Sequence, residues 1–492
     1  MVKTVIGDET QLKLVEDRLT RSAVPSQVGL VIGKLSSKLD RGFVYDLVPT
    51  PPNDAGEAPC SIIDGAGENN KNKKKNSMKA KYEPESSALF IDKDWVSEHA
   101  RQVSRMLLGG MKVVGIYIWV NESLFKNSTI AICQTVKGVA EAASLMIDWN
   151  ETLLIHIGYS PLRWTCRNCS LAANITSSSL RPCDFKMGKV LGSLQTFRCT
   201  YNFDLRLPIS HDDKLDCKRF SDVLRDEITV HAEELRSAKA LINGKLVTED
   251  EQCVSDDFHE VEFLIPFSQD KYLEACSRKG VLGVLLFRGF VCSLAYLNSK
   301  EAVSQALLDI KEDIIRSLQS RLEIMCDEAE RYIESVAEGG QETSNNIPSA
   351  QPVPHFDLQA QRKQCSLSFP RRVFVPWLEG TYICDYIQSS ETMEVLKDHC
   401  TELMSIEVPT DASEILEPES EAPAVITTTT KSFWDIATDY SSTGTPVNAV
   451  SKKIRKIGNE KPAKSADFQS MVAILVLILS VIVGLVCYIT GR

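Results

Sequence analysis

Hydrophobic and polar positions alternate along the first part of the chain in a way that predicts strands and helices in turn. The short apolar runs 28–33 and 43–48 are separated by the polar stretch SSKLDRG, a pattern that predicts a β-hairpin. Apolar residues at helical spacing over 95–107 predict a helix. The β-branched and aromatic residues of 112–120 predict a further strand.

The same alternation continues to residue 160. Residues 128–145 have helical spacing, and residues 152–159 predict another strand. A hairpin followed by alternating helix and strand indicates a layered α/β domain over residues 1–160. His99 lies on the apolar face of the first predicted helix, so we expect it to be a packed histidine rather than a ligand.

The second half of the chain follows a similar pattern, which predicts a second α/β region over 161–335. Residues 220–240 have the spacing of a helix, and residues 260–266 that of a strand. The seventeen apolar residues 281–297 carry Arg288 and two glycines, so they predict two buried strands joined by a tight turn near Arg288, rather than a membrane span.

A long amphipathic helix is predicted after residue 300. Its apolar stripe could serve a partner, but packing on the protein's own sheet is the favoured reading. Residues 336–366 form a polar linker, and residues 367–404 predict a strand, a second strand and a helix. The stripe consists of Val303, Leu307, Ile310, Ile314, Leu318, Leu322 and Met325.

Two polar segments interrupt this order. Residues 51–87 hold PPND, a lysine-rich stretch and few large apolar groups, so we expect a disordered insertion. Its lysines could contact acidic lipid headgroups, although a solvated loop is the simpler reading. Residues 405–470 turn acidic and rich in Ser, Thr and Pro, then basic, which predicts a disordered tether.

The most apolar segment of the chain is 471–489, which has neither charge nor proline. As a helix it would be roughly 28 Å long at ~1.5 Å per residue, about the thickness of a bilayer's hydrocarbon core, so we expect a transmembrane helix. Along this span the anchoring residues include Met471, Leu475, Leu479, Ile482, Leu485 and Ile489.

The flanks of this segment predict its orientation. The first residues of the chain have no apolar core typical of a signal peptide. Basic residues precede the span, and positive flanks stay cytoplasmic. We therefore expect a tail-anchored protein with a cytosolic body. The basic residues are Lys452, Lys453, Arg455, Lys456, Lys461 and Lys464.

Composition narrows the function classes. The net charge of −11 argues against nucleic acid as a partner. Fifteen cysteines, an odd number at scattered spacing, indicate reduced thiols in a cytosolic body. The N-x-S/T sequons in this body are expected to be chance matches.

Two groups of cysteines are candidates for chemistry. Cys166 and Cys169 form a C-x-x-C pair, with Cys183 and Cys199 at wider spacing, so a zinc site is an open alternative but free thiols are the favoured reading. Cys384 is followed by Asp385 and could be the nucleophile of a hydrolase. Simple packing of Cys384 in a strand is the favoured reading, and the hydrolase is the alternative.

Recognisable catalytic motifs are missing from the sequence. The seven histidines never fall within four residues of one another, which excludes the H-x-H and H-E-x-x-H patterns of zinc enzymes. Neither a G-x-S-x-G elbow nor a phosphate-binding glycine loop occurs. We therefore expect no cofactor and no enzymatic activity.

Two short segments resemble strands of MPN domains. Residues 27–33 (QVGLVIG) are similar to the x-x-G-L-L-x-G strand, and residues 113–120 (VVGIYIWV) to the V-V-G-W-Y-H-x-H strand. The resemblance implies an MPN-like N-terminal domain. In metalloprotease members the second segment carries two zinc-binding histidines.

At the family's zinc-site positions this chain has other residues. The two histidines correspond to Ile118 and Val120, the aspartate to Ala131 and the general-base glutamate to Ser26, while the family's serine corresponds to Ser128. These residues remove both imidazole ligands, the carboxylate ligand and the base. An MPN fold here is therefore expected to be non-catalytic and without metal.

Most of the chain resembles the odorant response abnormal protein four family, in its plant-type form. The resemblance is carried by VGLVIGKLSS, RGFVYDLVPTPP, SLRPCDFK, PRRVFVPWLEGTYICDYIQ and the apolar tail. It implies a protein anchored by its tail in the endoplasmic reticulum. It also implies binding and localisation of the protease specific for the ubiquitin-fold modifier, and support for the folding and trafficking of polytopic receptors.

The predicted tether contains one isolated aromatic patch. Phe433 and Ile436 flank Trp434 with the spacing aromatic-x-x-aliphatic. Ubiquitin-fold proteins of the autophagy type bind such a segment as an added strand. The patch is therefore a candidate linear motif.

Overall fold

The computed structural model describes the greater part of the chain up to residue 426. The chain divides after Thr429, and the described residues all belong to the unit Met1–Thr429. The described residues are 2–36, 40–63, 87–143, 151–171, 175–176, 178–210, 220–247, 258–265, 281–338, 370–388, 391–408, 414–419 and 425–426.

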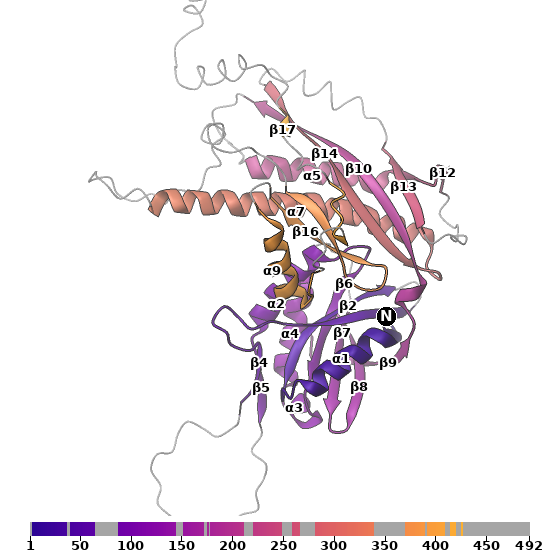
Figure 1. Cartoon of the computed structure of the whole chain (residues 1–492), viewed down its shortest axis with the longest axis vertical. Coiled ribbons are helices and arrows are strands. Elements are labelled where there is room, and N and C mark those ends of the chain that lie inside the picture. Colours follow the sequence, from indigo (N-terminus) through magenta and orange to yellow (C-terminus); the bar gives the residue numbers. More distant parts are fainter. Residues whose placement is uncertain are drawn as a thin grey trace, which may run out of the picture. The chain divides into compact units, whose positions relative to one another are not determined.

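The N-terminal part is a closed barrel with strand order β1-β3-β2-β6-β7-β8-β9 (Figure 1). β1 closes the barrel because it pairs in parallel with both β3 and β9. β2 and β3 pair antiparallel, which confirms the predicted hairpin. The strands are β1 (Thr4–Asp8), β2 (Gln27–Ser36), β3 (Arg41–Pro49), β6 (Lys112–Trp119), β7 (Glu151–Tyr159), β8 (Leu162–Ser170) and β9 (Arg181–Gly188).

Four helices accompany the barrel, and α2 and α4 confirm the predicted helices 95–107 and 128–145. The Asp8 carboxylate fixes the start of α1, because it accepts hydrogen bonds from the backbone N–H groups of Thr10 and Gln11. Its other oxygen accepts from the N–H groups of Val190 and Leu191, which follow β9. The helices are α1 (Glu9–Arg21), α2 (Lys93–Met106), α3 (Glu122–Asn127) and α4 (Thr129–Ala143).

The ends of the predicted insertion are ordered, so disorder from residue 51 onward is wrong there. β4 (Cys60–Ile63) and β5 (Ala88–Ile91) pair antiparallel. Cys60 and Leu89 are buried, and the Trp95 indole N–H donates to the Pro51 carbonyl at 2.9 Å. A few apolar side chains are enough to pack these ends. The lysine-rich centre, residues 64–86, lies outside the described residues.

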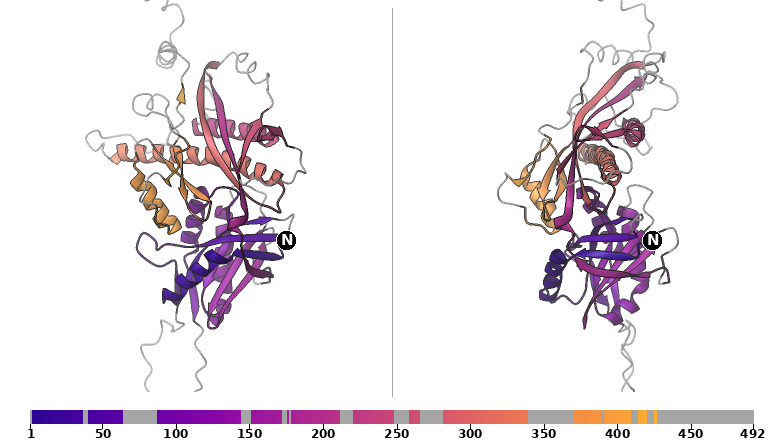
Figure 2. Two further views of the ribbon diagram at one scale, coloured as in Figure 1. Left: turned by 45° about the vertical axis from the view of Figure 1, so that its right-hand side comes forward. Right: turned by 90° about the vertical axis from the view of Figure 1, so that its right-hand side faces the viewer.

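A second sheet has the strand order β12-β11-β13-β10-β14-β17, and α5 and α7 lie on one side of it (Figure 2). Six of the seven stripe residues of α7 are buried, and Leu307 is half-buried, which confirms packing within the protein. The elements are η1 (Leu191–Ser193), β10 (Leu194–Ser210), α5 (Phe220–Ser237), β11 (Lys239–Ile242), β12 (Lys245–Leu246), β13 (Phe258–Leu264), β14 (Val281–Asn298), α7 (Val303–Glu338) and β17 (Val425–Ile426).

The prediction of two strands and a turn over 281–297 is wrong, because β14 is one continuous strand antiparallel to β10. Arg288 lies opposite Asp204 in this pair and forms an ion pair with it at 3.1 Å. Both side chains are partly exposed. A cross-strand partner therefore accommodates the charge that suggested a turn.

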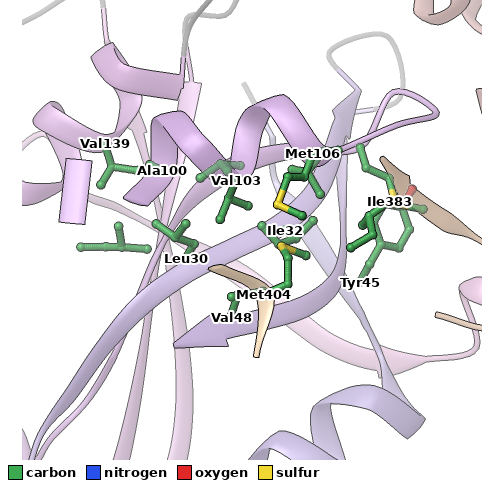
Figure 3. Packing of buried hydrophobic residues seen from close by; sticks show 14 of the residues in the cluster. Leu30, Ile32, Tyr45, Val48, Ala100, Val103, Met106, Val139, Ile383 and Met404 are labelled. Atoms are coloured by element: carbon green, nitrogen blue, oxygen red, sulfur yellow. The ribbon is translucent and has the colours of Figure 1, made fainter. Parts of the chain in front are cut away.

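The predicted strand–strand–helix piece is confirmed as β15 (Arg371–Pro376), β16 (Tyr382–Ile387) and α9 (Met393–Met404). It shares a core with the barrel. Figure 3 shows Ile383 of β16 and Met404 of α9 with side chains from β2, β3, α2 and α4.

The predicted domain boundary at residue 160 falls between β7 and β8, so the barrel includes two strands, β8 and β9, that lie beyond this boundary.

Part of the predicted tether, residues 405–470, is ordered. Phe374 and Leu416 exchange two backbone hydrogen bonds of 2.8 and 2.9 Å, Ile415 is buried, and Glu419 is fully buried. Disorder is therefore wrong for residues 414–419. Acidic composition suggested a solvated linker, but one of these carboxylates neutralises a buried arginine.

The predicted membrane anchor, residues 471–489, lies outside the described residues. Within the part of the chain that the structure describes, no helix is long and apolar enough to cross a membrane. The candidate motif with Phe433, Trp434 and Ile436 also lies beyond the described residues.

Candidate functional site

The two positions expected to correspond to zinc-binding histidines lie at the end of β6. Ile118 is paired with Val28 of β2 on one side and with His156 of β7 on the other. Ile118 and Val120 have no exposed surface and belong to the main apolar core. These positions therefore contribute packing and no ligand atoms.

The remaining positions of the predicted degenerate site have structural partners. The Ser26 hydroxyl bonds to the Cys60 thiol, although burial outweighs this contact and raises the pKa of Cys60 to about 11. The Ser128 hydroxyl accepts from the Leu89 N–H at 2.7 Å. Ala131 lies in the first turn of α4, beside the core residue Ile132. The described side chains here hold β4 and β5 against the barrel.

His156 is a buried histidine near these positions that the sequence did not single out. Its ring stacks on Phe125 at 4.0 Å, and its Nε2 lies 3.0 Å from the Val120 carbonyl oxygen. Its Nδ1 is 3.6 Å from the Glu122 carboxylate. Burial lowers the pKa of His156 and favours the neutral ring. Sequence reasoning did not find His156, because its partners come from other elements.

The four cysteines considered for zinc do not form one cluster. Cys166 and Cys183 are opposite each other in β8 and β9. Cys169 is three residues on in a strand, so it faces the other way, and its Sγ lies 3.5 Å from the Ser179 hydroxyl. Cys199 is buried in the second sheet. Among the described residues no group of three or more His, Cys, Asp or Glu side chains could hold a metal ion.

Cys384 lacks the features of a catalytic thiol. It is fully buried, burial raises its pKa to about 11, and its Sγ contacts the Arg105 carbonyl at 3.4 Å. Asp385 points to the opposite face of β16 and pairs with His399 at 2.8 Å, which raises the pKa of His399. A thiol in this setting stays protonated, so the hydrolase alternative gains no support.

His99 is packed, as predicted. It is 3% exposed, its Nδ1 lies 3.2 Å from the Thr50 hydroxyl, and its Nε2 lies 2.8 Å from the Leu403 carbonyl. The histidine therefore connects α2 with β3 and with the end of α9.

Buried ion pairs connect α7 to the surrounding elements. Arg372 of β15 binds both carboxylate oxygens of Asp313 at 2.8 Å, and Arg321 binds both oxygens of Glu419 at 2.7 Å. The Tyr386 ring lies 5.7 Å from each guanidinium carbon. Near the barrel, Lys34 of β2 pairs with Asp309 at 2.6 Å. Sequence reasoning missed all of these pairs.

Relatives with similar sequences carry one name, Protein odr-4 homolog. The protein from Mus musculus is 24% identical over 445 residues, which cover 86% of this chain and 87% of the relative. The Homo sapiens protein is 25% identical and covers 80% and 81%, respectively. The Dictyostelium discoideum protein is 24% identical and covers 82% and 81%.

Among solved structures, one described as the crystal structure of UfSP from C. elegans is similar at a TM-score of 0.40 and 9% sequence identity. The similarity covers 86% of this chain and 61%, less than two thirds, of that chain.

The family comparison covers the greater part of the sequence. Residues 29–415 match the family described as ODR4-like, Odorant response abnormal 4-like. The matched range includes strands of both sheets and all of β15, β16 and α9. The chain therefore belongs to the ODR4-like family.

Proposed function

We propose that this protein is a non-enzymatic adaptor of the endoplasmic reticulum membrane. Its N-terminal barrel is a degenerate MPN-like domain that binds the protease specific for the ubiquitin-fold modifier. Its apolar segment 471–489 inserts into the membrane and holds the complex there. Through this localisation it supports the folding and trafficking of polytopic receptors, and relatives in animals would serve G-protein-coupled receptors.

The observation that carries the proposal is the burial of Ile118 and Val120. Apolar side chains without exposed surface stand where a metalloprotease of this type has two histidines. Ala131 and Ser26 stand at the positions compared with the remaining ligand and the general base, so these positions lack the groups that bind zinc and activate water in metalloprotease members. A domain without these groups can still bind another protein, and the role that we propose for it is pairing with an MPN-like partner.

Membrane attachment supplies the second half of the function. An adaptor held at one membrane face raises the effective concentration of its bound partner there without any new contact. Membership in the ODR4-like family supports this reading.

Copurification tests the proposal directly. The full-length protein would be isolated in detergent and combined with the modifier-specific protease of the same organism in size-exclusion chromatography. We expect one complex near one-to-one stoichiometry. A variant lacking residues 471–492 should keep the complex in solution and lose its membrane fraction. Separate elution would contradict the adaptor function, and recovery of receptors and chaperones without the protease would favour a trafficking factor acting alone.

A further inference from the structure

Two thiols meet across neighbouring strands at the seam where the barrel closes. Cys166 of β8 is directly opposite Cys183 of β9 in an antiparallel pair. Residues so paired have Cα atoms about 4.5–5.5 Å apart, within the ~4.4–6.8 Å that a disulfide requires. The geometry points to a reversible redox site in which Cys166 and Cys183 form a disulfide on exposure to peroxide.

Access to solvent distinguishes Cys183 from most of the other thiols that the structure describes. Ten cysteines belong to the described residues, and of these only Cys183 and Cys326 are partly exposed. Cys183 is thus accessible to a small oxidant, while Cys166, opposite it in the strand pair, is buried at 3% exposure. In a redox-sensitive cysteine pair, a partly exposed thiol attacks the oxidant, and a buried thiol beside it resolves the resulting sulfenic acid.

The electrostatics of the pair agree with this division of roles. The hydrogen bond between the two thiols lowers the pKa of Cys183, and the same bond together with burial raises the pKa of Cys166. The Cys183 thiolate would attack hydrogen peroxide, giving a sulfenic acid and hydroxide. The Cys166 thiol then displaces the sulfenic oxygen as water and leaves a disulfide. Peroxide is the oxidant, and both cysteines are oxidised.

The disulfide would strengthen the seam of the barrel. β9 pairs with β1 beginning at Asp184, the residue after Cys183, and the Cys183 Sγ already lies 3.7 Å from the Val2 carbonyl. A covalent link from β8 to β9 therefore ties together three consecutive strands at the closing edge. In a reducing compartment the bond would form only during exposure to oxidant and be reversed by thiols.

Intact-mass spectrometry of the full-length protein tests the site. After treatment with hydrogen peroxide and quenching, we expect the loss of two hydrogen atoms, restored by dithiothreitol. Tryptic peptides should link 164–167 to 168–186, a fragment that holds both Cys169 and Cys183. Cys183→Ser should abolish the link, and Cys166→Ala should do the same while leaving Cys183 as an oxygenated thiol.

Two matched variants separate this pair from its alternatives. Cys169→Ser should leave the disulfide intact, whereas a C-x-x-C disulfide would be lost with it. Cys326→Ser removes the other partly exposed thiol and should change nothing. A link that survives Cys183→Ser, or addition of oxygen to Cys183 in the wild-type protein without any link, would overturn the proposal.

Discussion

Arg321 of α7 binds both carboxylate oxygens of Glu419 at 2.7 Å, and both side chains are completely buried. Glu419 also accepts hydrogen bonds from the backbone N–H groups of Cys292 and Arg372. One carboxylate from an acidic segment thus connects α7, β14 and β15. Removal of one partner of a buried pair leaves an uncompensated charge, which costs far more than the pair itself contributes.

Glu419→Gln should therefore lower the free energy of unfolding by about 3–5 kcal/mol. The matched control is Glu417→Gln, which removes the partner of Arg371 at a partly exposed position and should cost less than about 1 kcal/mol. Urea denaturation followed by tryptophan fluorescence would measure both. If the two substitutions have equal effects, the burial of Glu419 does not decide its contribution to the free energy of unfolding.

A chain that ends at residue 404 lacks Glu419 and should be destabilised as the Glu419→Gln variant is.

Lys34→Met should destabilise the protein, because it removes a buried ion pair between the barrel and α7. Lys34 of β2 lies 2.6 Å from Asp309 and 3.5 Å from Glu301, and all three side chains are nearly buried. Loss of the ammonium leaves two buried carboxylates without a cation, at a cost of about 3–5 kcal/mol. Lys112→Met removes a half-exposed pair with Glu312 on the same helix and is expected to cost less than about 1 kcal/mol. Denaturation midpoints compare the two, and a smaller loss for Lys34→Met would refute the prediction.

Asp46→Asn should stabilise the protein in a pH-dependent manner. Burial raises the pKa of Asp46 to about 6, against the hydrogen bond from the Leu47 N–H and the nearby Arg18. Between the ordinary pKa of an aspartate and the raised one, the folded state binds a proton more tightly than the unfolded state does. The contribution of Asp46 to the free energy of unfolding therefore falls as the pH rises toward 6. The asparagine variant avoids that loss. We expect a gain of roughly 1–2 kcal/mol at pH 7–8 that disappears near pH 4.

The difference between wild-type and variant unfolding curves, taken at several pH values, isolates this contribution. Asp17→Asn, at an exposed position, serves as the control for the substitution itself. A gain of the same size at every pH would contradict the titration of Asp46.

Histidines introduced at the two positions compared with the MPN pattern should not create a metal site. Ile118→His and Val120→His place imidazoles in fully buried apolar positions, and each should cost about 1–3 kcal/mol. The carboxylate ligand and the base are still absent at Ala131 and Ser26. We expect no zinc by elemental analysis of the purified double variant. Ile118→Val with Val120→Ile controls for packing alone, and stoichiometric zinc in the histidine variant would disprove the expectation.

The candidate motif beyond the described residues has its own test. Phe433→Ala with Ile436→Ala should abolish binding to an autophagy-type ubiquitin-fold protein, because both side chains would fill pockets beside the added strand. Trp434→Ala changes the aromatic residue between them and should retain binding. Calorimetry with the full-length protein in detergent gives the affinities. Unchanged binding in the double variant would eliminate the motif.

The sequence by itself determined the local elements and the family. Period and residue type were enough for β6, α2, α7 and the β15–β16–α9 piece, because the helices have an apolar stripe at helical spacing and the strands are short runs rich in β-branched and aromatic residues. The residue types at the two positions compared with zinc-binding histidines, Ile118 and Val120, also come from the sequence alone, because the residue type decides whether a side chain has ligand atoms.

Only the tertiary structure decided which distant residues meet. Arg288 suggested a turn until Asp204 was found opposite it, and Glu419 suggested a solvated linker until it was found against Arg321. Likewise the C-x-x-C spacing grouped Cys166 with Cys169 only along the chain, whereas strand register places Cys166 opposite Cys183. A charge or a thiol has the same local signature whether it is solvated or paired. Its partner comes from another element, so neither periodicity nor composition can reveal it.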